Sequence, residues 1–217
     1  MTDRDRDLEY ELAAELRGLL LQLHRSDSDA SVLRDAIAEI RTIRAGLATE
    51  PKPRWFDAIG TDGRAHLHDM NFNDGSLFRG RSNALSAGMS AEIVDLADGR
   101  RRVEARVVCN QLYEGPPHGV HGGYVAGLFD DVLGGTIRLV DGPSAVTGTL
   151  EVKYRKVTPL DTELHFVAWV DYTSGRRILS KATCHANGVL TAEAEALFIR
   201  VDMRALADRQ ADYRPRA

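Results

Sequence analysis

The sequence lacks the features of membrane-spanning and secreted chains. No run of about 18 apolar residues occurs, and no apolar signal region follows the charged N-terminal segment. Cysteine is scarce: Cys109 and Cys184 stand far apart and form no CxxC pair. We expect both to behave as small core residues and not as a disulfide or a metal site. The protein is therefore expected to be cytoplasmic, with no membrane partner.

A basic excess and the common nucleotide and hydrolase motifs are also missing. The 217 residues hold 28 Lys and Arg against 32 Asp and Glu, a net charge of −4, so nucleic acid is not an expected partner. There is no GxGxxG, P-loop or GxSxG motif. His66 and His68 stand at strand spacing beside Asp69, but no further ligand cluster accompanies them. We therefore expect no metal.

Leucine and isoleucine recur at helical spacing in residues 1–50, which predicts a helical hairpin as an N-terminal extension. Ser26 to Asp29 interrupts the period with residues that favour helix starts. The expected apolar stripes are Leu8, Leu12, Leu16, Leu19, Leu20 and Leu23, then Leu33, Ile37, Ile40 and Leu47. Each stripe has to be covered by the partner helix or by the rest of the chain. Residues 51–82, rich in Gly, Asp and Asn, are expected to form a mostly irregular connector over the domain.

Residues 83–203 are the expected main domain, followed by a tail at 204–217. Alternating apolar and polar residues predict strands at 89–93, 103–107, 146–154, 164–172, 177–185 and 190–201. Hairpin-turn signals separate several of them: Asp98-Gly99, Ser174-Gly175 and Asn187-Gly188. One apolar segment, about 122–140, interrupts the strands and predicts a helix buried on all sides. This order predicts an α+β fold, an antiparallel sheet wrapped on a helix.

The start of that helix has the parts needed to attack a carbonyl group. Gly122 and Gly123 leave backbone N–H groups bare at the positive end of the helix dipole. Asp130 and Asp131 lie in the middle of the segment, and carboxylates are rarely buried without a partner or a role. Adjacent helical residues point about 100° apart, so one of the two acids is expected to face a given cleft.

The segment His121-Gly122-Gly123 with Asp130 nine residues after the histidine resembles the hotdog-fold acyl-CoA thioesterases of the phenylacetate-degradation type. The resemblance extends from about Asn83 to Asp202 and includes the strand Thr147 to Tyr154, followed by Thr158-Pro159. It implies a hotdog fold and hydrolysis of an acyl-CoA thioester to a free acid and CoA, with no cofactor besides the CoA of the substrate.

The resemblance also implies roles for single residues. The Gly122 N–H would polarise the thioester carbonyl, and Asp130, favoured over Asp131 by its offset from His121, would be the general base or the nucleophile. Thr147 would hold water or substrate, with Thr149 on the same strand face as the fallback. His121 is expected to orient the loop and the glycine amides and less to act as an acid or base.

Several substrate contacts are expected around this centre. Gly123 continues the amide cluster, while Arg155 and Lys156 near a strand end are candidates for the CoA phosphates, with plain surface charge as the alternative. Relatives often carry Asn or Gln six residues before the histidine, where this chain has Gly115. Asn110 or Gln111 would replace that amide only if the loop doubles back.

Gly122 and Asp130 are eight residues apart on one helix, about 12 Å along its axis. One carbonyl cannot contact both within one chain, so a site shared between two subunits is expected, in a homodimer or a dimer of dimers, as the resemblance also implies. Two alternatives stay open. One is a hotdog enoyl-thioester hydratase; the other is a non-catalytic acyl-CoA sensor whose N-terminal helices bind DNA. The seven Arg against eleven Asp and Glu in residues 1–50 disfavour the second.

Overall fold

The computed structural model describes residues 3–47 and 74–211. The expected connector lies mostly outside these residues, as do His66 and His68. The elements of the main domain follow the predicted order. The strands are β1 (Ser90–Asp95), β2 (Arg101–Val108), β3 (Ala145–Tyr154), β4 (Glu163–Ser174), β5 (Arg177–Ala186) and β6 (Val189–Arg200). All six predicted strands are confirmed, with ends shifted by a few residues.

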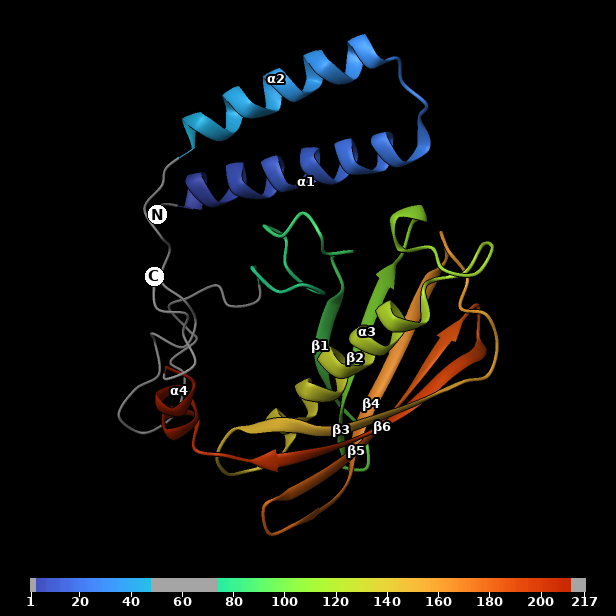
Figure 1. Cartoon of the computed structure of the whole chain (residues 1–217). Coiled ribbons are helices and arrows are strands. Elements are labelled where there is room, and N and C mark those ends of the chain that lie inside the picture. Colours follow the sequence, from blue (N-terminus) through green and yellow to red (C-terminus); the bar gives the residue numbers. More distant parts are fainter. Residues whose placement is uncertain (1–2, 48–73, 212–217) are drawn as a thin grey trace.

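The strands form one antiparallel sheet in the order β1-β2-β4-β5-β6-β3 (Figure 1). The hairpin turns occur at the predicted glycines, because Gly99, Gly175 and Gly188 have φ values of +81°, +56° and +76°. These left-handed conformations are easy for glycine and costly for most other residues. β3 follows the helix in sequence and, among the described residues, pairs only with β6, so its other edge has no strand partner in the described part of the chain.

Helix α3 (Gly122–Gly135) lies across the concave face of the sheet and continues as the short helix η3 (Thr136–Leu139) (Figure 1). One stripe of α3 is buried against the sheet, at the helical spacing of three and four: Val125, Leu128, Phe129, Val132 and Leu133. The sheet presents short side chains beneath it, namely Ala168, Ala182, Ala192, Ala194 and Ala196. These small residues allow the helix to approach the strands closely, and the larger side chains then fill the core.

The expectation of a helix buried on all sides is wrong for the single chain. Ala126, Gly127 and Asp130, on the side of α3 away from the sheet stripe, are only half-buried. The irregular segment at 74–82 covers part of this side, because the ring of Phe78 occupies the space that a side chain at Gly127 would need. The described end of the connector therefore lies over the domain, as predicted.

The N-terminal extension consists of α1 (Asp3–Arg25) and α2 (Ala30–Gly46), and α1 lies between α2 and the sheet domain (Figure 1). Polar contacts attach α1 to the domain. Tyr10 donates to Asp74 at 2.5 Å, and Arg17 donates to the Asn83 carbonyl at 3.1 Å. Ala13 is the buried apolar residue of this face. α2 has no buried residue.

The predicted apolar stripes of the two helices are not covered within one chain. The six leucines of the first stripe remain 37–59% exposed, and the four residues of the second remain 38–53% exposed. The expectation that the partner helix or the rest of the chain covers them is therefore wrong for the described single chain. The physical reason is that α1 turns a different face, carrying Tyr10, Ala13 and Arg17, towards the domain. The tail predicted as a short helix or disorder contains α4 (Met203–Ala211).

Candidate active site

The paired glycines form the start of α3, with His121 as the residue before the helix. The His121 ring accepts a hydrogen bond at Nδ1 from the Gly123 N–H, at 3.0 Å. A protonated Nδ1 could not accept it, so this bond selects the imidazole with its proton on Nε2. The Gly122 N–H donates to no acceptor among the described residues. The helix start therefore presents one bare amide at the positive end of the helix dipole.

A doubled-back loop positions His121. The His121 N–H donates to the Tyr113 carbonyl at 2.7 Å, and the Gly115 N–H donates to the Gly119 carbonyl at 2.9 Å. The predicted Thr158-Pro159 pair supports the loop from the other side, where the Thr158 carbonyl accepts from the Val120 N–H at 2.8 Å. The chain thus fixes the histidine and the following amides through backbone hydrogen bonds on both sides.

Gly115 cannot carry the amide that relatives often have at this place. A Cβ added there would lie 2.6 Å from the Cα of His121. The loop does double back, but it gives neither predicted replacement to the helix start. The Asn110 side chain accepts from the Leu112 N–H at 3.0 Å and caps the short helix η2 (Gln111–Tyr113). Gln111 accepts from Arg25 of α1 at 3.0 Å.

The two neighbouring acids on α3 have different surroundings. Asp131 pairs with Arg79, with 2.7 Å between the carboxylate and guanidinium atoms, and the two side chains are 13% and 22% exposed. Burial raises the pKa of Asp131, and the charge of Arg79 opposes that rise. Asp130 accepts a hydrogen bond from the Thr147 hydroxyl at 2.9 Å and is half-exposed. Asp131 is thus neutralised within the fold, whereas Asp130 remains accessible beside a hydroxyl group.

A β-bulge in β3 separates the two candidate threonines. Thr147 pairs with Phe198 of β6 and Thr149 with the next residue, Leu197, so that Gly148 is the extra residue. Two residues on either side of a bulge lose the strict alternation of faces. Thr147 therefore points to the helix side with Leu150, and Thr149 points to the outer face. The expectation that the two threonines share a face is wrong.

Arg155 and Lys156 follow the end of β3, and both of their N–H groups donate to the Thr191 carbonyl, at 2.8 and 3.0 Å. The Arg155 side chain forms an ion pair with Glu193. Tyr154, just before them, donates its hydroxyl to the Gly122 carbonyl at 2.7 Å. The two cations therefore lie near the start of α3, although Arg155 is already paired.

Sequence reasoning missed two residues that shape this region. Tyr154 bonds to the first glycine of the helix, and its place on the apolar face of the predicted strand was the available signal. Arg79, which neutralises Asp131, lies in a segment without a periodic pattern, so no signal pointed to it.

In the described ranges, no group of three His, Cys, Asp or Glu side chains is placed to hold a metal ion. Both cysteines are free and buried, as predicted. No helix in the described part of the chain is long and apolar enough to cross a membrane.

Comparison of the whole fold decides the architecture. A solved thioesterase superfamily protein matches 88% of this chain and 94% of its own, with a TM-score of 0.70 and 23% sequence identity. The chain has the hotdog fold. The match covers more than the sheet domain can supply, so it extends into the N-terminal helices. The predicted hotdog fold with an N-terminal extension is thereby confirmed.

Sequence comparison points to the same group of proteins. Acyl-coenzyme A thioesterase THEM4 of Xenopus laevis is 32% identical over 107 residues, which are 46% of this chain and 47% of that protein. The chain thus matches about half the length of this curated relative. Among solved structures, a phenylacetic acid degradation-related protein of Ralstonia eutropha JMP134 is also similar, at 24% identity and a TM-score of 0.46 with 52% of this chain and 85% of that chain covered, but this similarity is too low to carry an argument. No protein-family model matches the sequence. The predicted resemblance to hotdog thioesterases is confirmed.

Proposed function

We propose that the protein hydrolyses acyl-CoA thioesters to free acids and CoA. The single observation that carries this proposal is the contrast on α3. Asp131 is neutralised by Arg79 at 2.7 Å, while Asp130 is half-exposed and bonded to Thr147 at 2.9 Å. An accessible carboxylate beside a hydroxyl group is suited to activate water or to attack a carbonyl carbon. The 32% identity to an acyl-CoA thioesterase supports the same reaction.

The proposed reaction uses the Gly122 N–H at the helix start and the carboxylate of Asp130. The thioester carbonyl accepts the bare N–H of Gly122, and the helix dipole stabilises the negative charge that develops on its oxygen. His121 holds the neighbouring Gly123 N–H in place, so the amides need no reorganisation. Asp130 then takes a proton from the water molecule that attacks the carbonyl carbon, or attacks this carbon itself to form a mixed anhydride that water hydrolyses to the free acid. The Thr147 hydroxyl fixes the orientation of Asp130. The CoA thiolate leaves, and the reaction requires no metal or redox cofactor.

The site is proposed to be shared between two subunits. α3 is a continuous helix, so Gly122 and Asp130 are separated by about 12 Å along its axis. A two-fold dimer through the open edge of β3 would bring Gly122 of one protomer towards Asp130 of its partner, because β3 carries Thr147 beside the acid. We propose a homodimer or a dimer of dimers of this kind in the cytoplasm, with acyl-CoA as ligand and Arg155 or Lys156 near its phosphates.

An acyl-CoA panel tests the reaction. Release of free CoA thiol is measured over short, long and aromatic acyl groups, and we expect turnover of at least one class. Absence of thiol release with the whole panel would contradict the proposed hydrolysis.

Complementation tests the shared site. Inactive Asp130→Asn protein is mixed with an inactive Gly122→Val variant under subunit exchange. Heterodimers regain one intact site, so activity should return. Verified heterodimers without activity would place both groups in separate sites or in one chain.

Single turnover in water labelled with ¹⁸O separates the two roles of Asp130. A nucleophilic Asp130 incorporates the label into its own carboxylate, whereas a general base leaves the label only in the product acid. Mass spectrometry of the peptide that contains Asp130 gives the answer.

A further inference from the structure

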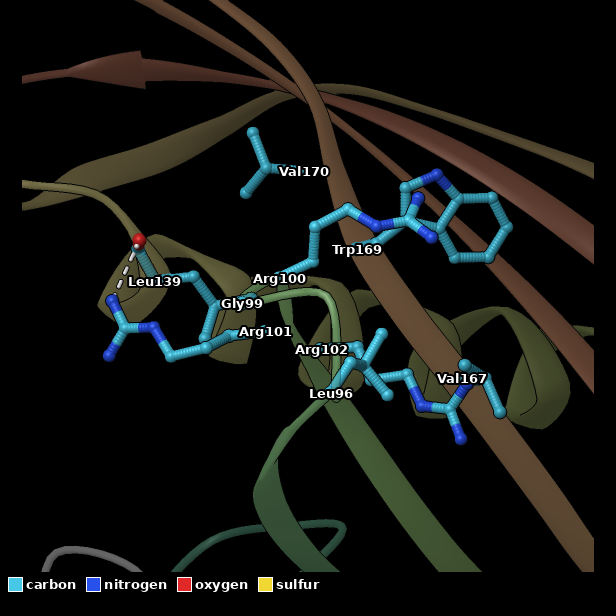
Figure 2. A pocket seen from close by; sticks show the side chains of 9 residues that line it. All are labelled: Leu96, Gly99, Arg100, Arg101, Arg102, Leu139, Val167, Trp169 and Val170. Atoms are coloured by element: carbon cyan, nitrogen blue, oxygen red, sulfur yellow. Dashed lines mark hydrogen bonds between the residues drawn. The ribbon is translucent and has the colours of Figure 1, made fainter.

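A cavity of about 450 Å³ lies away from Asp130, at the end of the sheet where β2 begins (Figure 2). Its walls come from the β1–β2 turn with the start of β2, from Val167 to Val170 of β4, and from Leu139 at the end of η3. The volume is within the range of small-molecule sites in proteins. In the sheet order, β5 and β6 stand between β4, which lines the cavity, and β3, which carries Thr147. The cavity is therefore separate from the candidate active site.

The charged side chains that line this cavity are three consecutive arginines, Arg100, Arg101 and Arg102. Arg101 donates to the Leu139 carbonyl at 3.1 Å and has no carboxylate partner among the described residues (Figure 2). Asp98 partners Arg100 at 2.7 Å, but both side chains are largely exposed. The cavity therefore has an excess of positive charge.

Arg102 is balanced less completely than its ion pair suggests. Its partner, Glu104, also accepts a hydrogen bond from His165 Nε2 at 2.9 Å and lies 4.0 Å from Arg106. One carboxylate thus serves several basic groups. Because Glu104 is shared in this way, it compensates the charge of Arg102 only in part. Together with Arg101, which has no carboxylate partner among the described residues, this leaves a surplus of positive charge at the cavity.

Two lysines on the outer sheet face provide a contrast, because each lies beside acids. Lys153 pairs with Glu151 at 3.2 Å. Lys181 lies 2.9 Å from Asp171 and 3.8 Å from Glu195. The surplus of positive charge at the β1–β2 end is therefore not repeated around these two lysines.

The remaining walls are apolar: Leu96, Leu139, Val167, Trp169 and Val170. Arginine guanidinium groups match phosphate oxygens in a planar, bidentate geometry. Aromatic side chains provide a flat surface on which a nucleobase stacks. From this combination we propose that the cavity binds a nucleotide, with its phosphates on the arginines and its base against Trp169. Its source is either a free nucleotide or the nucleotide end of CoA; the second source rests on the proposed function and would replace Arg155 and Lys156 as the contacts of the CoA phosphates.

Trp169 supplies the readout for a binding test. The chain has two tryptophans, so a Trp55→Phe variant leaves Trp169 as the single tryptophan reporter. ADP should change its fluorescence saturably, and adenosine and pyrophosphate should each bind at least about tenfold more weakly, because each lacks one half of the proposed contacts. Calorimetry on the unmodified chain should give the same order of affinities. No saturable ADP signal by either method would overturn the site, and pyrophosphate binding equal to that of ADP would overturn the role of the base.

Matched arginine variants locate the site. Arg101→Gln should weaken ADP binding by about tenfold or more, whereas Arg177→Gln at the start of β5, outside the cavity, should leave it unchanged. Equal binding by all three proteins would overturn the assignment to this cavity.

Acyl-CoA kinetics of the Arg101→Gln variant distinguish the two sources. A raised KM with unchanged kcat identifies the nucleotide end of CoA, and an unchanged KM together with lost ADP binding identifies a free nucleotide. Either outcome supports the site. A protein that binds ADP at this cavity but hydrolyses no acyl-CoA would contradict the proposed function and leave the nucleotide site intact.

Discussion

Asp130 and Asp131 show how two identical side chains, one residue apart, acquire different chemistry. The direction in which each leaves the helix decides its partner: a threonine hydroxyl for Asp130 and an arginine for Asp131. A carboxylate that already neutralises a largely buried guanidinium is poorly suited to accept a proton during a reaction. Because Arg79 occupies Asp131, the Arg79–Asp131 pair supports Asp130 as the reactive acid as much as the contacts of Asp130 do.

Replacement of the two acids should separate chemistry from stability. Asp130→Asn keeps the shape of the side chain but removes the base, so we expect kcat to fall by about 10²–10⁴ with folding intact. Steady-state thiol release and circular dichroism measure the two effects. Asp131→Asn is the matched control and should cost far less activity. A larger kinetic loss at Asp131 would show that the roles of the two acids are reversed.

Of these two variants, Asp131→Asn should be the less stable. Asp131→Asn leaves the Arg79 guanidinium without its counter-charge in a partly solvent-screened position, so we expect unfolding to become easier by about 1–3 kcal/mol. Urea denaturation measures this loss. The double variant Asp131→Asn with Arg79→Gln should recover part of it, and no difference between the single variant and the parent chain would contradict the importance of the pair.

The buried cysteines give a pH-dependent prediction. Burial raises the pKa of Cys109 to about 12 and that of Cys184 to about 11, from 9.0. The folded chain then keeps these protons when the unfolded chain has lost them, so their contribution to stability falls as pH rises above about 9. Thiol-reagent kinetics should show slow modification of the folded protein at pH 8–9 and rapid modification in denaturant. Equal rates would contradict burial of the neutral thiols.

At the scale of elements, β3 shows where sequence patterns succeed and where they fail. Alternation predicted its limits closely, because a strand packed on one side needs apolar residues at every second position. It did not predict the bulge at Gly148, because alternation assumes regular pairing with β6; the glycine inside the strand was the available signal. The same limit applies to Arg79, whose contact joins an irregular segment to a distant helix.

The helix start was predicted more completely than the strand. His121, Gly122 and Gly123 act through backbone geometry that is local in sequence, so their spacing carries most of the information. The apolar character of α3 did not reveal that one side is half-exposed, because burial depends on what else covers the helix. The two helices of the extension were also predicted, because helical spacing is local in sequence. The face of α1 that contacts the domain was not predicted.

The bulge leads to a paired prediction for Thr147 and Thr149. Thr147→Val removes the hydroxyl that donates to Asp130 and should lower kcat by about 10–100-fold, in line with the loss of a positioned hydrogen bond. Thr149→Val removes a hydroxyl from the outer face and should leave kcat within about twofold. Kinetic measurement of both variants on one substrate tests the register, and equal losses would contradict the separation of the two side chains by the bulge.

At the scale of the whole molecule, the extension is the part whose contacts differ most from expectation. Its attachment to the domain is made by the side chains of Tyr10, Arg17 and Arg25, while its leucines remain 37–59% exposed. Exposed apolar surface of this extent marks a region of intermolecular contact or of aggregation. The exposed apolar stripes thus indicate that the extension contributes to contacts between molecules more than to the stability of the single domain.

Deletion of residues 1–50 should therefore change behaviour in solution. The truncated chain loses the contacts at Asp74, Asn83 and Gln111 and uncovers the surface beneath Ala13, so we expect lower solubility or a different assembly. Light scattering and thermal melting compare the truncated and full chains. A truncated protein with unchanged solubility, activity and molar mass would mark the extension as dispensable.

The hydrogen bond between Arg25 and Gln111 connects the N-terminal extension to the loop that precedes α3. Gln111 begins η2, which ends at Tyr113, and the Tyr113 carbonyl holds the N–H of His121. One side-chain bond, one turn of helix and one backbone bond therefore connect α1 to the start of α3. A change in the position of α1 would therefore reach the helix start at Gly122, where the carbonyl oxygen of the proposed substrate is held.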